Sequence, residues 1–305
     1  MSHRNCVLAL IIFALNFPLS ANAESTAKEL QKEADKMREY EHFQPALQMI
    51  DKAIAKEPTT GGLYLTRAKI FDDMGKSKEA IASYAKAIQF SPKSFEAYRS
   101  RGKLNASMKQ YDLAIQDFTK SIEIKPQFKG GYGDRALTYE IMKNYPKAIE
   151  DYTETIKHTD AVRDWYWNHR AKCYVALKQY DKAVKDYDQA LKIKPASYEA
   201  IHGRAQMYVF LGKPDLALAD YTSLLKIHPD DPDAYIKLGD IYFQKGDNKK
   251  ALDAYNGAMS LEIDDSPFIY EKRARVLRKL GKNDLAVKDE KKALLLRQAN
   301  PAPKL

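Results

Sequence analysis

The residues that come closest to a catalytic or metal-binding pattern in this sequence are two histidines, His169 and His202. Imidazole groups bind zinc and transfer protons, but a zinc site needs three or four ligands. No carboxylate or third ligand stands at an obvious spacing from the pair. The chain also lacks a P-loop, a G-x-G-x-x-G loop, an H-E-x-x-H helix, a paired-cysteine motif and a nucleophile elbow. We therefore expect no metal, no cofactor and no enzymatic activity, and we interpret the histidines as ordinary polar groups of a groove.

Arginine and aspartate recur in a coupled pattern, in which each aspartate follows its arginine by sixteen residues. The arginines are Arg101, Arg135, Arg170, Arg204 and Arg273, and the aspartates are Asp117, Asp151, Asp186, Asp220 and Asp289. Where Leu238 takes the place of the arginine, Ala254 takes the place of the aspartate. This coupling predicts a bidentate, partly buried ion pair that joins two helices and stabilises the structure rather than binding a ligand.

These pairs belong to a repeat that fills most of the chain. Its central alanines are Ala46, Ala80, Ala114, Ala148, Ala183, Ala217, Ala251 and Ala286, and the intervals between them are 34, 34, 34, 35, 34, 34 and 35 residues. A fixed period of this length is typical of a helical solenoid, in which each repeat must stack on its neighbours to bury its apolar face.

Each repeat has two segments with the 3.6-residue apolar period of a helix, which we call the A helix and the B helix. One place in the A helix is always small: Ala34, Ala68, Gly102, Ala136, Ala171, Ala205, Gly239 and Ala274. The fourth residue after the central alanine is large in seven repeats: Ile50, Tyr84, Phe118, Tyr152, Tyr187, Tyr221 and Tyr255. Small residues let the two helices approach, and the large side chains fill the space beside them. We interpret these aromatic side chains as core.

The pattern resembles the tetratricopeptide repeat (TPR) family, in which Trp or Tyr, Leu-Gly, Tyr, Ala, an aromatic residue, Ala and Pro recur within 34 residues. The resemblance implies an all-α, right-handed superhelical solenoid of antiparallel helix pairs, whose concave groove commonly binds peptides or proteins. It divides the chain into a single solenoid over 24–300 and a tail over 301–305. The expected repeats are 27–60, 61–94, 95–128, 129–162, 164–197, 198–231, 232–265 and 267–300.

The groove positions of the fifth to seventh repeats carry a mixed aromatic, apolar and polar lining. We expect a partner to bind at Trp165, Asn168, His169, His202, Phe210, Ile236 and Phe243, unless part of this set packs between repeats. The family's carboxylate clamp, which captures acidic C-terminal peptides, is not matched. Its places hold Asn168 and Lys172, then Gly203, then Asp233 and Lys237. A chaperone-tail function is therefore not implied.

The chain is basic, with 50 Lys and Arg against 41 Asp and Glu and a net charge of +9. The signs are interspersed, which is typical of a solvated surface. The alternative interpretation is a preference for acidic partners such as an anionic polymer or a lipid surface. A basic face of the last A helix, formed by Lys272, Arg275, Arg278 and Lys279, is either solvated or an anchor for such a partner. The lack of a repeated base-reading pair makes nucleic acid an unlikely partner.

The N-terminus has the pattern of a secretory signal peptide, with Arg4 before an apolar run over 7–17 and an Ala-Asn-Ala site that ends at Ala23. We expect cleavage near Ala23, a mature chain that starts at Glu24, and a periplasmic or secreted protein. The apolar run is short for a membrane span, although an uncleaved anchor is the alternative. Cleavage would remove Cys6 and leave Cys173 as the one cysteine, which we expect to be buried.

The last B helix carries Glu290 at the place of the core aromatic residue and then three consecutive leucines, Leu294, Leu295 and Leu296. These leucines either fold back on the eighth repeat or form a docking or homodimer surface. The sequence as a whole favours a non-enzymatic exported scaffold that binds a protein or peptide in its groove. The alternative is an accessory factor that binds an anionic polymer or membrane surface, which salt dependence would distinguish.

Overall fold

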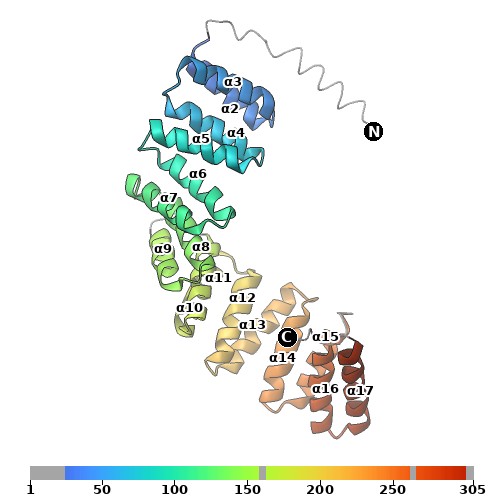
Figure 1. Cartoon of the computed structure of the whole chain (residues 1–305). Coiled ribbons are helices and arrows are strands. Elements are labelled where there is room, and N and C mark those ends of the chain that lie inside the picture. Colours follow the sequence, from blue (N-terminus) through green and yellow to red (C-terminus); the bar gives the residue numbers. More distant parts are fainter. Residues whose placement is uncertain (1–24, 158–162, 262–265, 300–305) are drawn as a thin grey trace. The chain divides into compact units, whose positions relative to one another are not determined.

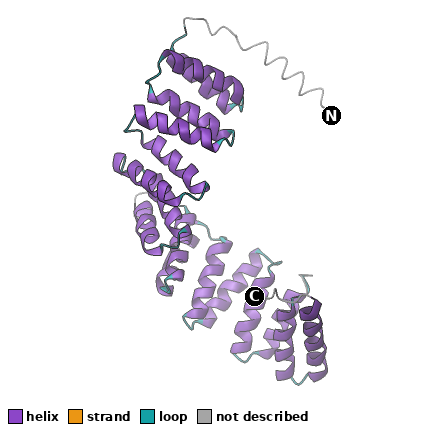
Figure 2. Ribbon diagram, viewed as in Figure 1, coloured by secondary structure: helices purple, strands orange, loops and turns teal. Residues whose placement is uncertain are grey.

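The computed structural model describes residues 25–157, 163–261 and 266–299, and every regular element within these ranges is an α-helix (Figures 1 and 2). The predicted signal peptide, the cleavage site and the tail over 301–305 lie outside the described residues. Among the residues that are described, no helix is both long and apolar enough to cross a lipid bilayer.

Sixteen helices follow one another along the described chain, two for each expected repeat. The A helices are α2 (Ala27–Glu39), α4 (Gly61–Asp73), α6 (Phe95–Ser107), α8 (Gly130–Ile141), α10 (Asp164–Ala176), α12 (Tyr198–Phe210), α14 (Pro232–Gln244) and α16 (Pro267–Lys279). The B helices are α3 (Phe43–Lys56), α5 (Ser77–Phe90), α7 (Tyr111–Ile124), α9 (Tyr145–Lys157), α11 (Tyr180–Ile193), α13 (Pro214–Ile227), α15 (Asn248–Met259) and α17 (Asn283–Ala299). The fold is therefore an all-α solenoid of helix pairs, as the sequence predicts.

The chain forms two compact units that meet within α8, one ending at Thr138 and the other beginning at Tyr139. In the first unit, each helix from α2 to α7 packs against the next helix along the chain. In the second unit, the same holds from α9 to α17 (Figure 1). Contacts are thus between sequence neighbours, as expected for a solenoid.

The turn from an A helix to its B helix has one left-handed residue in each repeat. Glycine occupies it in four repeats, at Gly75, Gly212, Gly246 and Gly281, and Glu41, Lys109, Lys143 and Lys178 occupy it in the others. In the second repeat, the Gly75 N–H donates to the Asp72 carbonyl oxygen at 2.8 Å, and the Lys76 N–H donates to the Phe71 carbonyl oxygen at 2.8 Å. These bonds satisfy carbonyl groups that the helix end would otherwise leave unpaired.

Within each compact unit, the core lies between the A and B helices and between neighbouring repeats. All eight central alanines are 0% exposed, and Tyr84, Tyr152 and Tyr221 are at most 1% exposed. The small places are needed for this packing, because a Cβ atom on Gly102 would lie 2.8 Å from Cε1 of Phe118.

The structure brings together four of the predicted arginine–aspartate pairs. In Arg170 and Asp186, Nε and Nη2 each donate to one carboxylate oxygen at 2.7 Å. The pairs Arg101–Asp117, Arg204–Asp220 and Arg273–Asp289 have the same bidentate geometry. All four aspartates are buried. Arg135 and Asp151 belong to different compact units, so that pair stays a prediction.

A second bond, which the sequence analysis missed, joins several of these arginines to the preceding B helix. Its acceptor is the fifth residue after the preceding central alanine. The bonds run from Arg135 to Thr119, from Arg170 to Thr153, from Arg204 to Asp188 and from Arg273 to Asn256. Arg67 has the same place in the second repeat and donates to Asp51 at 2.8 Å. Each such arginine therefore couples neighbouring repeats.

Candidate functional site

A pocket of about 390 Å³ in the second compact unit lies between α10 and α12. We call it the α10–α12 pocket. It is lined by Lys172, Val175, Tyr187, Tyr198, Glu199, His202, Gly203, Gln206 and Met207. A volume of this order is sufficient for a large side chain of a ligand.

Gly203 explains why the pocket has an aromatic wall. A Cβ atom at this residue would lie 2.5 Å from Cζ of Tyr187, so only glycine lets α12 lie so close to that ring. Tyr187 is 3% exposed and Met207 is 1% exposed, which means that the apolar part of the lining is held by the core. The pocket therefore has a rigid apolar side that a ligand can pack against.

The polar side of the pocket is built around His202. Its Nε2 lies 2.8 Å from Oδ2 of Asp233, and its ring is stacked on Tyr198 with the centroids 5.7 Å apart. The hydrogen bond from His202 is the main reason why the pKa of Asp233 is lowered, although burial opposes it. His202 also packs edge-on against Tyr221, whose buried hydroxyl has no hydrogen-bond partner among the described residues.

Asn168 lies next to the pocket and carries a second unpaired polar atom. Its side chain is 1% exposed, and its Nδ2 donates to Oε2 of Glu199 at 3.5 Å. Its Oδ1 is buried and has no partner in the described part of the chain. Glu199 also forms an ion pair with Lys172. Buried polar groups are almost always hydrogen-bonded, so this acceptor is an unsatisfied group of the protein interior beside the pocket.

Trp165 and His169 come together at a different place, beside the end of α8. Their ring centroids are 3.9 Å apart, and His169 Nδ1 lies 2.9 Å from Oε2 of Glu140. The Tyr152 hydroxyl donates to the same carboxylate oxygen at 2.6 Å. Burial alone would raise the pKa of Glu140, but these hydrogen bonds hold it below its ordinary value. The two predicted histidines thus bind separate carboxylates.

Of the seven residues of the predicted lining, His202 lines the α10–α12 pocket and Trp165, Asn168 and His169 do not. Phe210, Ile236 and Phe243 lie outside it as well. Phe210 is 64% exposed and stacks on Tyr180 with the centroids 5.0 Å apart. Ile236 and Phe243 are half-buried and pack against the core cluster that contains Tyr255. These two residues therefore pack between helices. The 3.6-residue apolar period does not indicate by itself which apolar residues of an A helix are covered by a neighbour.

The basic face of α16 is less available than its composition suggests. Lys272 donates to Asp240 at 2.6 Å, and Arg278 forms two bonds to Glu290 at 2.8 and 2.7 Å. Arg275 and Lys279 are exposed. Two of the four predicted cations are thus already paired with carboxylates of this chain.

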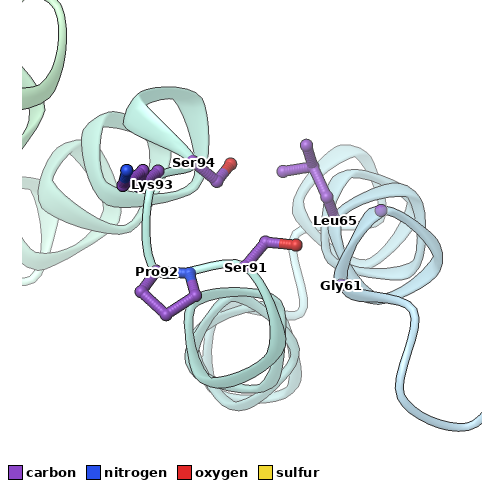
Figure 3. A pocket seen from close by; sticks show the side chains of 7 residues that line it. Gly61, Leu65, Ser91, Pro92, Lys93 and Ser94 are labelled. Atoms are coloured by element: carbon purple, nitrogen blue, oxygen red, sulfur yellow. The ribbon is translucent and has the colours of Figure 1, made fainter.

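The first compact unit has a shallow hollow of about 570 Å³ between α4 and the turn from α5 to α6 (Figure 3). Figure 3 shows Ser91 and Ser94 on the turn, with their side chains towards Gly61 and Leu65 on α4. A Cβ atom on Gly61 would clash with Ser91, so the hollow depends on glycine. Its lining contains no acidic side chain and one lysine, and it offers no acid–base pair.

Ion pairs between successive A helices neutralise many of the acidic side chains on these helices. They join Arg38 to Asp73, Lys69 to Glu96, Arg99 to Asp134, Lys172 to Glu199, His202 to Asp233, and Lys272 to Asp240. Such exposed or half-exposed pairs add little stability.

Sequence reasoning missed most of the residues that line the α10–α12 pocket. Tyr187 was assigned to the core alone, and Val175, Glu199, Gln206 and Met207 were not singled out. A usable signal was present at Gly203, because glycine within a helix lowers stability unless something must approach the backbone closely. The approaching group, the ring of Tyr187, could not be identified without the structure.

Models of the tetratricopeptide repeat match the chain over 68–109, 95–128, 165–197 and 202–267. No curated protein shows significant sequence similarity to it. Among solved structures, a tetratricopeptide repeat protein from Parabacteroides merdae is similar with 20% identity and a TM-score of 0.54, covering 82% of this chain and 98% of that one.

The C-terminal part of a TPR repeat-containing protein from Cytophaga hutchinsonii is similar with 21% identity and a TM-score of 0.67, covering 76% of this chain and 95% of that one. YrrB, a TPR protein with an unusual peptide-binding site, is similar with 18% identity and a TM-score of 0.53, covering 68% of this chain and 97% of that one. At these identities the similarity concerns the fold, and the repeat models identify the family. The chain belongs to the tetratricopeptide repeat family.

Proposed function

We propose that this protein is a non-enzymatic interaction scaffold that binds an extended peptide segment of a partner protein in the α10–α12 pocket. The fold supports a role in protein–protein interaction, and a peptide-binding protein is among its structural neighbours. The observation that carries the proposal is the pocket itself, which combines an apolar wall held by the core with polar side chains at its rim.

The chemistry of the pocket favours an uncharged segment with one large apolar side chain. Tyr187, Met207 and Val175 supply the apolar contacts. Lys172 and Glu199 neutralise each other at the rim, and so do His202 and Asp233 when the histidine is protonated. A charged ligand would have to compete with these pairs, whereas an uncharged apolar side chain could enter without displacing either of them.

A random peptide library displayed on phage tests this proposal. Peptides selected on the full chain should bind at least about tenfold more weakly to Gln206→Trp, which fills the pocket from a half-buried position of its lining. The matched control is Lys185→Trp, at an exposed position of α11 outside the pocket lining, and it should bind like the parent. Equal binding by all three proteins would place the site elsewhere.

The rival proposal is a charge-driven complex with an anionic polymer or lipid surface. Arg275 and Lys279 are the exposed cations of the basic face that supports it. Such a complex should weaken steeply as the salt concentration rises towards the physiological value, whereas the peptide complex should change little. Binding of selected peptides and of anionic vesicles at two salt concentrations separates the two proposals.

Export is a separate part of the proposal, and it rests on the signal-peptide pattern that ends at Ala23. N-terminal sequencing of the protein from its producing cells should give Glu24 as the first residue. Recovery of chains that retain Met1 would contradict export by cleavage.

A further inference from the structure

The eighth repeat exposes a surface that every preceding repeat covers. In each B helix, the first and the eighth residues after the central alanine lie on one side of the helix, two turns apart. Both places are apolar in all eight repeats. They are Leu47 and Ile54, Ile81 and Ile88, Ile115 and Ile122, Ile149 and Ile156, Val184 and Leu191, Leu218 and Leu225, Leu252 and Met259, and Val287 and Leu294.

The exposure of these two places differs sharply between repeats. In the first seven repeats both residues are buried or half-buried. In the eighth, Val287 is 38% exposed and Leu294 is 57% exposed, and no described residue covers them. Leu295 beside them is 62% exposed, at a place where the other repeats have alanine or a polar residue. The eighth repeat has therefore kept its stacking surface and has enlarged it by one leucine.

The two residues between these apolar places are changed in a way that disfavours a further repeat of the same kind. The fourth place carries Glu290 in place of a core side chain. The fifth place, which accepts a bond from the next repeat's arginine at Asp51 and Asp188, carries Lys291. An A helix that brought such an arginine would meet a like charge at Lys291.

The opposite end of the solenoid does not fit this surface either. On several A helices after α2, an apolar pair faces the preceding B helix, such as Leu63 and Ile70, or Ala200 and Met207. The corresponding residues of α2 are Glu29 and Lys36, both exposed. Head-to-tail stacking would place the leucines against these charges, so growth of a filament is not expected.

We propose that α17 is the interface of a homodimer, in which two copies of this helix pack antiparallel about a two-fold axis between Glu290 and Lys291. In this register Val287 of each copy lies beside Leu294 of the other, and Glu290 of each copy lies beside Lys291 of the other. The apolar pair and the charged pair are thus each made twice. One surface is complementary to itself, as an isologous interface requires.

The dimensions of α17 agree with this register. The helix has 17 residues, whereas the other B helices have between 12 and 14. Its middle residue is Lys291, so a two-fold axis beside this residue overlaps the two helices over almost their whole length of about 25 Å. Glu290 is held in place by its two bonds to Arg278 in the same chain. The charged centre of the interface is therefore pre-oriented.

Light scattering coupled to size exclusion, on the full chain at concentrations from about 1 to 100 µM, tests the dimer. The parent should approach the mass of two chains at the upper concentrations. Lys291→Glu sets two glutamates of opposite copies against each other and should remain at the mass of one chain. The double variant Glu290→Lys with Lys291→Glu restores opposite charges in the antiparallel register and should recover the dimer.

Two controls make the outcome specific. Leu285→Asp changes an exposed leucine about 180° around α17 from Leu294 and should leave the mass unchanged. The variant Gln206→Trp should also leave it unchanged, which separates the dimer from peptide binding. Circular dichroism confirms that each variant is folded. A parent that stays monomeric throughout, or a double variant that stays monomeric when the parent dimerises, would overturn the proposal.

Discussion

Replacing Asp186 with alanine removes a buried carboxylate from one end of an ion pair and leaves the arginine behind. Asp186 accepts bonds from Nε and Nη2 of Arg170, both at 2.7 Å. The side chain of Arg170 is 12% exposed, and its remaining bond goes to the Thr153 hydroxyl at 2.8 Å. After the substitution, a largely buried guanidinium would have no carboxylate among the described residues.

The expected cost follows from this burial. Breaking a buried ion pair by removing one partner costs about 3 kcal/mol, because the other charge stays desolvated. Alanine has a higher helix propensity than aspartate, which stabilises α11 by about 0.6 kcal/mol and offsets part of this loss. The free energy of unfolding should therefore fall by about 2.5 kcal/mol.

Asp188→Ala is a matched control two residues further along the same helix. Asp188 is 40% exposed, and its partner Arg204 keeps both bonds to Asp220. Loss of an exposed pair costs about 0.5 kcal/mol, which the gain in helix propensity offsets. Urea denaturation followed by circular dichroism should show a midpoint lower by on the order of 1 M for Asp186→Ala alone. Equal midpoints for the two variants would refute the reasoning.

Three further predictions concern packing, acid stability and thiol chemistry. Gly203→Ala places a Cβ atom against the ring of Tyr187, so it should lower the free energy of unfolding by about 1 to 2 kcal/mol in the same urea assay. In the control Gly62→Ala, the Cβ atom would meet nothing closer than 3.8 Å, and the free energy of unfolding should rise by about 0.5 kcal/mol. Folding lowers the pKa of Asp233 below its ordinary value of 3.8, so at acid pH the unfolded chain binds more protons than the native chain, and the free energy of unfolding falls as the pH falls. In acid titrations, Asp233→Asn should reduce this dependence on pH. An unchanged dependence would contradict the pairing of Asp233 with His202. Cys173 is 0% exposed and burial raises the pKa of its thiol to about 12, so a thiol reagent should modify it in the unfolded chain and leave the native chain unmodified over the same time.

The repeat pattern predicts the fold well because its signals are local and recur eight times. The central alanines, the small A-helix places and the aromatic places mark the two helices of each repeat, and the structure has a helix at each of them. The coupling of arginine and aspartate also predicts four pairs correctly. Its signal is that the repeat in which Leu238 replaces the arginine also has Ala254 in place of the aspartate. The pattern does not identify Arg67, because the sixteenth residue after it is Ser83 and its acceptor, Asp51, precedes it in the chain.

The pocket was harder to predict because its residues come from successive A helices and from the core between them. Contacts such as His202 with Asp233 join side chains 31 residues apart, and nothing in the local sequence marks them. The sequence also does not distinguish an aromatic residue that lines a pocket from one that packs between helices. Tyr187 is core, as the sequence predicts, and its ring also borders the pocket. The groove role of Phe243 stays a prediction.

Hydrogen exchange measured by mass spectrometry tests the claim that the α10–α12 pocket binds a peptide. The full chain should be compared with and without a saturating amount of a peptide selected from the library. The claim predicts slower exchange in α10 and α12, with little change in α2 to α7. Slower exchange confined to other helices, or none at a concentration that saturates binding, would contradict it.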